Sequence, residues 1–197
     1  MVKEDKREAI LQATLELVAE NGFHDAPCSA IAERAGVAAG TIYRYFENKD
    51  VLIGELYHTL ESRITADIMV GYDPAQPVRE RFMHLGQVVL QYFIDNPQQF
   101  KFIEQFHHSP YGAAFRRDRI LGPVAAVDET CKCNLYRELL NEGVARQVIK
   151  DLPMPVLFDL AFGPIVFTAR NHILGFIRLD LQLIKQVVAA CWDGLSR

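Results

Sequence analysis

The stretch Ser29–Asp50 reads SAIAERAGVAAGTIYRYFENKD, and it decides the fold that we expect for this chain. Apolar residues recur in it at helical spacing on both sides of a single glycine, Gly36. They are Ile31, Ala32 and Ala35 before the glycine, and Val37, Ile42 and Phe46 after it. Because glycine has the permissive backbone that a tight turn needs, the pattern predicts two short helices that share one small core. This layout is typical of a helix-turn-helix, whose second helix enters the major groove of DNA.

The second short helix has a distinct outer face. If Ile42 and Phe46 point into the core, a helix with about 3.6 residues per turn directs the residues around them outward. The face predicted to meet DNA consists of Ala39, Gly40, Thr41, Tyr43, Arg44 and Tyr45. Arg44 carries donors that suit a guanine edge or a phosphate. Asn48 is a good N-cap for the next helix, so Lys49 and the free N–H groups beside it are predicted to bind a phosphate. The alternative is an ordinary surface helix whose tyrosines and arginine cover the core.

These residues carry a resemblance to a known family. Preceded by a helix that ends in ELVAENGF, the pattern IAERAGVAAGTIYRYFENKDVL resembles the N-terminal DNA-binding domain of TetR/AcrR-type transcriptional regulators, across roughly residues 5–60. The resemblance implies that the outer face holds the recognition-helix contacts, that Lys49 binds a phosphate and that Ser29 adds a contact from the preceding helix. The chain departs from the family pattern at Pro27, Cys28 and Ala38, where hydroxyl-bearing caps are usual. We therefore expect two side-chain caps to be missing.

The rest of the chain predicts an all-α fold. It has helical periodicity and no convincing strand alternation. Helices are expected over residues 6–21, 49–70, 78–95, 96–110, 111–121, 123–141, 155–174 and 179–195. We place a DNA-binding domain at residues 1–50 and a helical ligand-binding and dimerisation domain at residues 51–197. The long helix that enters the second domain ends at the linker GYDPAQP, residues 71–77.

Composition limits the class of protein. The chain has 197 residues, half of them apolar, with 12 Gly and 9 Pro, which excludes a disordered composition. Its N-terminus lacks an apolar signal core, and its longest apolar run, residues 160–169, is interrupted by glycine and proline. We therefore predict a cytoplasmic protein that is neither secreted nor inserted in a membrane. Residues 1–50 contain six Lys and Arg against nine Asp and Glu, so contact with DNA must depend on where the cations lie.

The last two predicted helices have apolar stripes wider than one neighbouring helix needs, which suggests a partner. We predict that they pair with a second copy as a four-helix bundle, so that the protein is a homodimer. The predicted interface consists of Leu157, Ala161, Ile165, Leu181, Ile184, Val188, Cys191 and Trp192. The alternative is that both stripes are buried within one subunit.

The resemblance also implies a small-molecule effector. Aromatic residues gather between residues 100 and 115, and the helix expected opposite them supplies more, with a few polar anchors among them. The predicted pocket consists of Phe102, Phe106, His107, Tyr111, Phe115, Phe162 and Asn171. The alternative is that most of these aromatics are plain core. The resemblance implies that a small hydrophobic or aromatic compound would change the spacing of the two DNA-binding domains of the dimer and so release a palindromic operator. It also implies repression, which is the family's usual mode.

The competing hypothesis is an enzyme. The pairs Glu55–His58 and Glu104–His107 match the Glu-x-x-His motif that helical di-iron carboxylate proteins use twice. That site also needs a Glu from each of two further helices, and no convincing inward pair stands out. A single Cys-x-Cys at residues 131–133 is more often structural than a metal site. Without a phosphate loop, a nucleophile elbow or a dinucleotide fingerprint, we predict no enzymatic activity, no metal and no cofactor.

Overall fold

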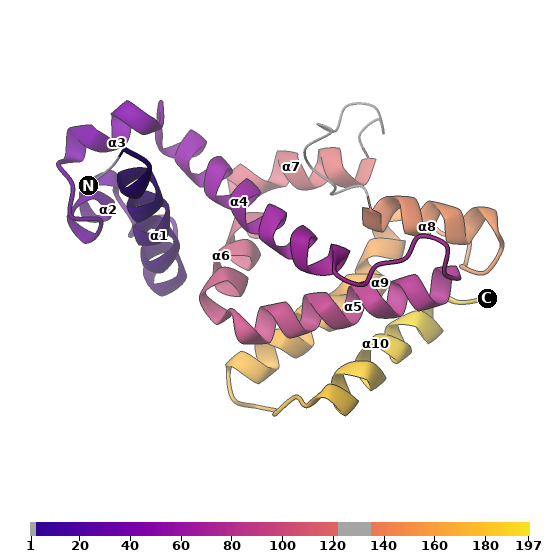
Figure 1. The fold of residues 1–197 in the computed structure, drawn as a ribbon. Coiled ribbons are helices and arrows are strands. Elements are labelled where there is room, and N and C mark those ends of the chain that lie inside the picture. The colour runs from indigo at the N-terminus through magenta and orange to yellow at the C-terminus, as the bar shows by residue number, and fades with distance from the viewer. Residues whose placement is uncertain (1–2, 122–134) are drawn as a thin grey trace. The chain divides into compact units, whose positions relative to one another are not determined.

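The computed structural model describes residues 3–121 and 135–197, and it builds them mostly from α-helices (Figure 1). The helices are α1 (Lys3–Asn21), α2 (Cys28–Arg34), α3 (Ala39–Tyr45), α4 (Lys49–Met69), α5 (Val78–Asp95), α6 (Pro97–His108), α7 (Pro110–Leu121), α8 (Leu135–Ala145), α9 (Met154–Ile173) and α10 (Leu181–Leu195). Within the described residues the only β pairing is an isolated antiparallel bridge between Ile149 and Ser196. The predicted all-α fold is confirmed.

Most predicted helix boundaries agree with the structure to within a few residues. The exception is the helix expected over residues 123–141, of which residues 123–134 lie outside the described part of the chain. What is described of it, α8, extends beyond the prediction to Ala145. None of the helices described here is long and apolar enough to cross a lipid bilayer.

Contacts divide the chain into two compact units. Unit 1 comprises Met1–Leu60 and Pro97–Phe115, and unit 2 comprises Glu61–Asn96 and Arg116–Arg197. The helix α6 therefore packs in the same unit as the helix-turn-helix, although it is far from it in the sequence. The boundary at residue 50 separates the predicted DNA-binding domain from the predicted ligand-binding and dimerisation domain, and it does not coincide with the division by contacts. It stays a prediction.

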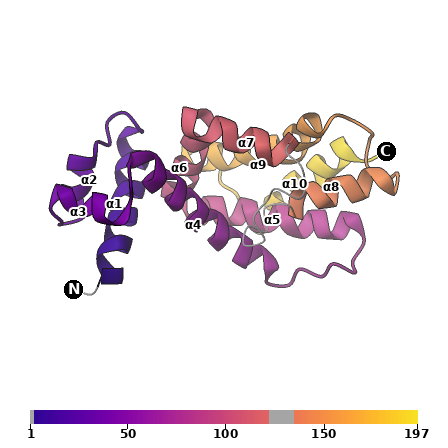
Figure 2. The same ribbon diagram turned by 90° about the horizontal axis from the view of Figure 1, so that it is seen from above.

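Unit 1 has its core between α1 and the helices that follow it. Figure 2 shows α1, α2 and α3 grouped near the N-terminus. The apolar face predicted for α1 is buried, and α1 packs against α2 and α6. Buried residues in and around α3 and α4 complete the core of unit 1. The central members of this core are Ile10, Ala13, Leu17, Val18, Ile31, Ile42, Phe46, Leu52, Leu56, Phe102 and Phe106.

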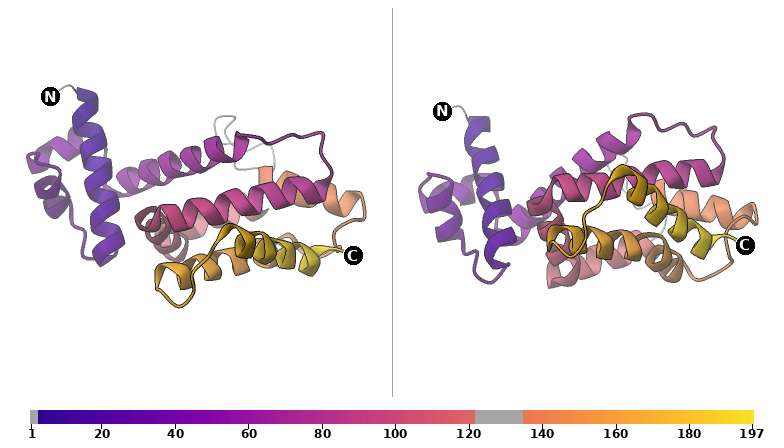
Figure 3. Two further views of the ribbon diagram at one scale, coloured as in Figure 1. Left: turned by 60° about the horizontal axis from the view of Figure 1, so that its bottom comes forward. Right: turned by 90° about the horizontal axis from the view of Figure 1, so that it is seen from below.

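Unit 2 is built around α5, α9 and α10, which pack against one another and run side by side in Figure 3. The closest approach involves Gly86 of α5, because a methyl group added there would lie 2.5 Å from Cγ1 of Val188 in α10. The rings of Phe82 and Trp192 also join these two helices, with centroids 5.5 Å apart. Every residue of the predicted α5 stripe that begins at Val78 and ends at Phe93 is buried.

A charged pair ties α5 to α8 inside unit 2. Arg81 is 7% exposed, and its Nη2 donates a hydrogen bond to Oε1 of Glu142 over 2.6 Å. Arg146, the residue just after α8, pairs with the same carboxylate oxygen at 2.9 Å. The hydrogen bond from Arg81 holds the pKa of Glu142 below its ordinary value.

Candidate nucleic-acid interface

The turn between α2 and α3 closes with a Schellman motif. Gly36 has a φ of 66°, in the left-handed region that glycine adopts without strain. Its N–H donates to the carbonyl of Glu33 at 3.1 Å, and the N–H of Val37 donates to that of Ala32 at 2.9 Å. These two bonds satisfy carbonyls that the end of α2 leaves open. The glycine turn that the sequence predicted is confirmed.

The recognition helix α3 is anchored on one side only. Ile42 and Phe46 are each 1% exposed, as predicted. The opposite side faces solvent: Tyr43 is 58% exposed, and Arg44 is also exposed. Of the other predicted contacts, Ala39, Gly40 and Ser29 are exposed, and Thr41, Tyr45 and Lys49 are partly exposed. The small and aromatic residues of α3 are therefore available to a ligand as large as a DNA duplex.

The caps of the three helices differ as expected. Neither Pro27, before α2, nor Ala38, before α3, makes a side-chain capping bond, which confirms that the two caps are missing. In contrast, Asn48 caps α4, because its Oδ1 accepts a hydrogen bond from the N–H of Val51 at 2.9 Å. The free N–H groups of the first turn of α4 thus start beside Lys49.

Lys49 has a partner that the sequence did not reveal. Its Nζ donates to the backbone carbonyl of Phe23, just beyond the end of α1, over 2.7 Å. An ammonium group has three N–H donors, so this bond leaves two for a phosphate. The same bond fixes the start of α4 to the end of α1.

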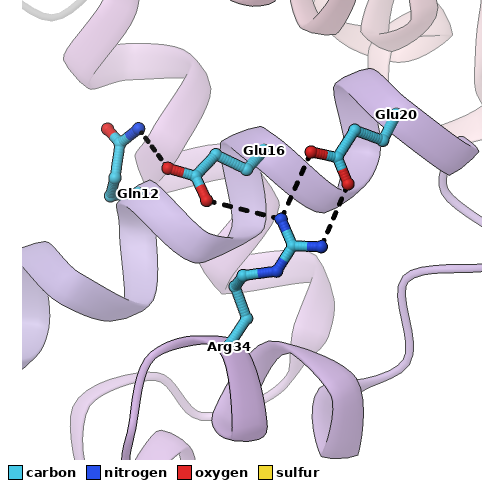
Figure 4. A network of polar contacts seen from close by, with 4 residues as sticks. All are labelled: Gln12, Glu16, Glu20 and Arg34. Atoms are coloured by element: carbon cyan, nitrogen blue, oxygen red, sulfur yellow. Dashed lines mark hydrogen bonds and ion pairs between the residues drawn. The ribbon is translucent and has the colours of Figure 1, made fainter.

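Charged side chains outside the predicted DNA-contacting face of α3 join α1 to the neighbouring helices α2 and α4. Figure 4 shows the guanidinium of Arg34, in α2, between Glu16 and Glu20 of α1. Its Nη2 donates to Oε2 of Glu20 at 3.0 Å, and this bond lowers the pKa of Glu20. At the other end of α1, Arg7 pairs with Glu55 of α4. These two arginines form ion pairs that join α1 to α2 and to α4.

Cys28 is not among the residues predicted from the sequence to contact DNA. It begins α2 and is partly exposed, and its interaction with Tyr43 raises the pKa of this tyrosine. The available signal was its position, because the resembled family usually has a hydroxyl-bearing residue there.

Comparisons with known proteins agree with this geometry. Residues 10–56 match the family model described as "Bacterial regulatory proteins, tetR family", and residues 77–196 match "Tetracyclin repressor-like, C-terminal domain". The chain belongs to the TetR family. It is a DNA-binding transcriptional regulator and not an enzyme.

Several individual relatives align with this TetR-family protein over nearly its whole length. The "Fatty acid metabolism regulator protein" of Bacillus subtilis is 47% identical over 191 residues, which are 94% of this chain and 93% of that protein. A solved TetR family transcription regulator from Marinobacter aquaeolei VT8 has the same fold, with a TM-score of 0.81 and 22% identity, over 98% of this chain and 96% of that one. The fatty acid degradation regulator FadR from Bacillus halodurans has a TM-score of 0.71 and 26% identity, over 98% and 97% of the two chains.

The residues predicted to bind an effector in this TetR-family regulator fall in two different units. Those from Phe102 to Phe115 belong to unit 1, where the ring of Phe106 stacks on Tyr57 of α4 with centroids 4.0 Å apart. Phe162 belongs to unit 2, where it packs at 4.7 Å against Tyr136 of α8. The predicted set is Phe102, Phe106, His107, Tyr111, Phe115, Phe162 and Asn171. Their role in binding stays a prediction.

Most of the residues predicted for the dimer interface lie inside unit 2. All except Leu181 are buried there, where α5, α9 and α10 cover them. The buried members are Leu157, Ala161, Ile165, Ile184, Val188, Cys191 and Trp192. Because α9 has apolar residues on more than one side, periodicity does not tell which stripe its own chain covers. This burial fits the alternative in which the stripes pack within one subunit, and the role of the eight residues in dimerisation stays a prediction. Burial raises the pKa of the Cys191 thiol to about 11.

The two Glu-x-x-His pairs do not build a metal centre. Within residues 3–121 and 135–197, no group of three or more His, Cys, Asp or Glu side chains is arranged to hold a metal ion. Glu55, from the first pair, is bound to Arg7. The cysteines at 131 and 133 lie outside the described residues. The family assignment removes the di-iron enzyme as an alternative.

Proposed function

We propose that this regulator is a cytoplasmic repressor that binds a palindromic operator as a homodimer and releases it when a small hydrophobic or aromatic molecule binds its C-terminal domain. The observation that carries the proposal is the exposed outer face of α3 above the buried Ile42 and Phe46. A helix held in this way presents side chains to base edges while its own core stays intact. The proposed DNA contacts are Ser29, Ala39, Gly40, Thr41, Tyr43, Arg44, Tyr45 and Lys49.

The proposed homodimer uses the exposed apolar sides of α9 and α10. On α9, exposed apolar side chains recur three or four positions apart at Val156, Leu160, Pro164 and Phe167. Leu174 follows just beyond the helix. On α10 a second series, partly or fully exposed, consists of Leu183, Val187, Ala190 and Gly194. This spacing is typical of helices that pack in a four-helix bundle. A twofold axis through such a bundle would relate two recognition helices, which must lie about 34 Å apart to read successive major grooves.

The proposed effector is apolar. Two relatives are named as regulators of fatty acid metabolism or degradation, and a fatty acyl chain is a small hydrophobic molecule. In unit 2, Phe158, Phe162 and Tyr136 form a cluster of partly buried rings from α8 and α9 that suits such a ligand. To release DNA, the effector must bind the DNA-free state more tightly than the DNA-bound state, by a few kcal/mol.

The DNA-binding part is tested with a duplex selected by the wild-type protein from a randomised library. We expect Arg44→Ala to lower the affinity for this duplex by about 5- to 150-fold and to relax the preference at one position of each half-site. The matched control is Lys101→Ala, which removes one positive charge from an exposed position of α6 in unit 1, outside the predicted DNA contacts. Equal losses for the two variants, on selected and random duplexes alike, would show that Arg44 does not read a base.

The effector part is tested on the same protein–DNA complex by fluorescence anisotropy. Palmitate represents a long acyl chain and benzoate represents a small aromatic acid. We expect one of them to release the selected duplex without unfolding the protein, as checked by circular dichroism. Release by neither compound would contradict the proposed effector class and leave the proposed DNA contacts intact.

A further inference from the structure

The turn that follows α1 is a meeting point of several elements of unit 1. The helix α1 ends at Asn21, and Gly22 continues with a φ of 84°. The N–H of Gly22 donates to the carbonyl of Val18 at 2.9 Å, which closes the last turn. Phe23 comes next and leads the chain toward α2. The position of this turn therefore controls how α1 is joined to the helix-turn-helix.

A side chain from α6 holds this turn through a hydrogen bond. Nε2 of Gln105 donates to the carbonyl of Val18 over 3.0 Å, so that this carbonyl accepts two bonds. The amide group lies against the turn itself, because a methyl group added at Gly22 would be 3.4 Å from Oε1 of Gln105. Gln105 is outside residues 10–56, which match the DNA-binding family model.

Two aromatic rings hold the same turn from the side. The ring of Phe23 meets Phe102 of α6 edge to face, with centroids 5.7 Å apart, and it meets Tyr111 of α7 at 5.4 Å. Phe102 is fully buried, so its ring has a fixed position in the core of unit 1. Aromatic pairs in this geometry are favourable beyond the area that they bury.

The same turn is also hydrogen-bonded to the start of α4. The carbonyl of Phe23 accepts the bond from Nζ of Lys49 at 2.7 Å. Only Phe46, Glu47 and Asn48 link Lys49 to the end of α3. Because this link is so short, the place where α4 begins determines where the recognition helix ends.

We propose that Gln105 is a positioning residue for DNA recognition, supported by Phe102 and Tyr111, because it fixes Phe23 and thereby Lys49 and the C-terminal end of α3. The inference rests on the proposed reading face of α3, and it adds to it a determinant from outside the helix-turn-helix. It predicts that a change at Gln105 alters the preference for operator over random DNA without a contact to either.

The test compares Gln105 with Gln98, an exposed glutamine on the same helix. Full-length Gln105→Glu and Gln98→Glu carry the same change in charge, but only the first removes the donor and places a carboxylate beside the carbonyl of Val18. We expect Gln105→Glu to bind the selected duplex about tenfold more weakly than Gln98→Glu, as expected for a hydrogen bond replaced by a repulsive contact. The loss on a random duplex should be clearly smaller, because displacement of Lys49 weakens a phosphate contact on any sequence, whereas displacement of the end of α3 weakens base contacts on the selected one only. Gln105→Lys keeps a donor, favoured at a helix C-terminus, and should match Gln98→Lys on both duplexes.

The outcomes separate this inference from the proposed function. Failure of the wild-type protein to select any duplex would overturn the proposed function and this inference with it. If the wild-type protein selects a duplex but Gln105→Glu and Gln98→Glu bind it equally, only the positioning role is refuted. A purely structural role for Gln105 would lower the melting temperature and weaken binding to selected and random duplexes by the same factor, which also refutes the inference.

Discussion

Replacement of Phe167 by glutamate should separate the proposed dimer without unfolding its subunits. Phe167 leaves 59% of its surface exposed on α9, which for a phenylalanine is about 100 Å². Removal of this area from water contributes about 2–3 kcal/mol at about 25 cal/mol/Å². A twofold interface contains the side chain twice. Because association offsets part of this gain, we expect the dimer dissociation constant to rise at least about a hundredfold.

The control for this experiment is Ile184→Glu, in the stripe that the chain itself covers. Ile184 is 3% exposed, so a carboxylate there would be buried in unit 2 and should unfold it. Sedimentation velocity measures the association of each variant, and circular dichroism measures its melting. We expect Phe167→Glu to be a folded monomer with a melting curve like that of the free wild-type subunit. If Phe167→Glu stays a dimer while Ile184→Glu is a folded monomer, the interface uses the stripe of α10 that contains Ile184, and the proposed interface is wrong.

Three further predictions concern unit 2. Gly86→Ala should lower the free energy of unfolding by about 1–2 kcal/mol in urea denaturation, because the new methyl group would overlap Val188. In a Val188→Ala background the same substitution should cost less, and an equal loss in both backgrounds would contradict the clash. The hydrogen bond from Arg81 lowers the pKa of Glu142 from 4.5. The stabilisation that this bond contributes is therefore present above pH 4.5 and is lost as the pH falls through the lower folded-state pKa. The wild-type protein should have a higher urea midpoint than Glu142→Gln at neutral pH but not in acid, and a difference that is unchanged in acid would refute the pairing. Because burial raises the pKa of Cys191 to about 11, iodoacetamide at about pH 8 should modify this thiol only after unfolding; rapid modification of the folded protein, seen by peptide mass spectrometry, would show that the thiol is accessible.

The helix-turn-helix could be predicted from the sequence because its determinants are local. The left-handed turn at Gly36 and the inward pair Ile42 and Phe46 lie within a few residues of one another. Helical geometry alone then directs Tyr43 and Arg44 toward solvent. The missing caps were also predictable, because a cap depends on the side chain at a single position.

Two features depended on tertiary structure. On α9 apolar residues occur on several sides, and periodicity does not tell which stripe the chain covers; packing against α5 and α10 buries Leu157 and leaves Phe167 exposed. Likewise, nothing in the local sequence of α6 connects Gln105 to the carbonyl of Val18, since the two residues are 87 positions apart. Local sequence determines where helices form and which residues share a face, whereas the neighbour that covers each face is decided only when distant segments pack together.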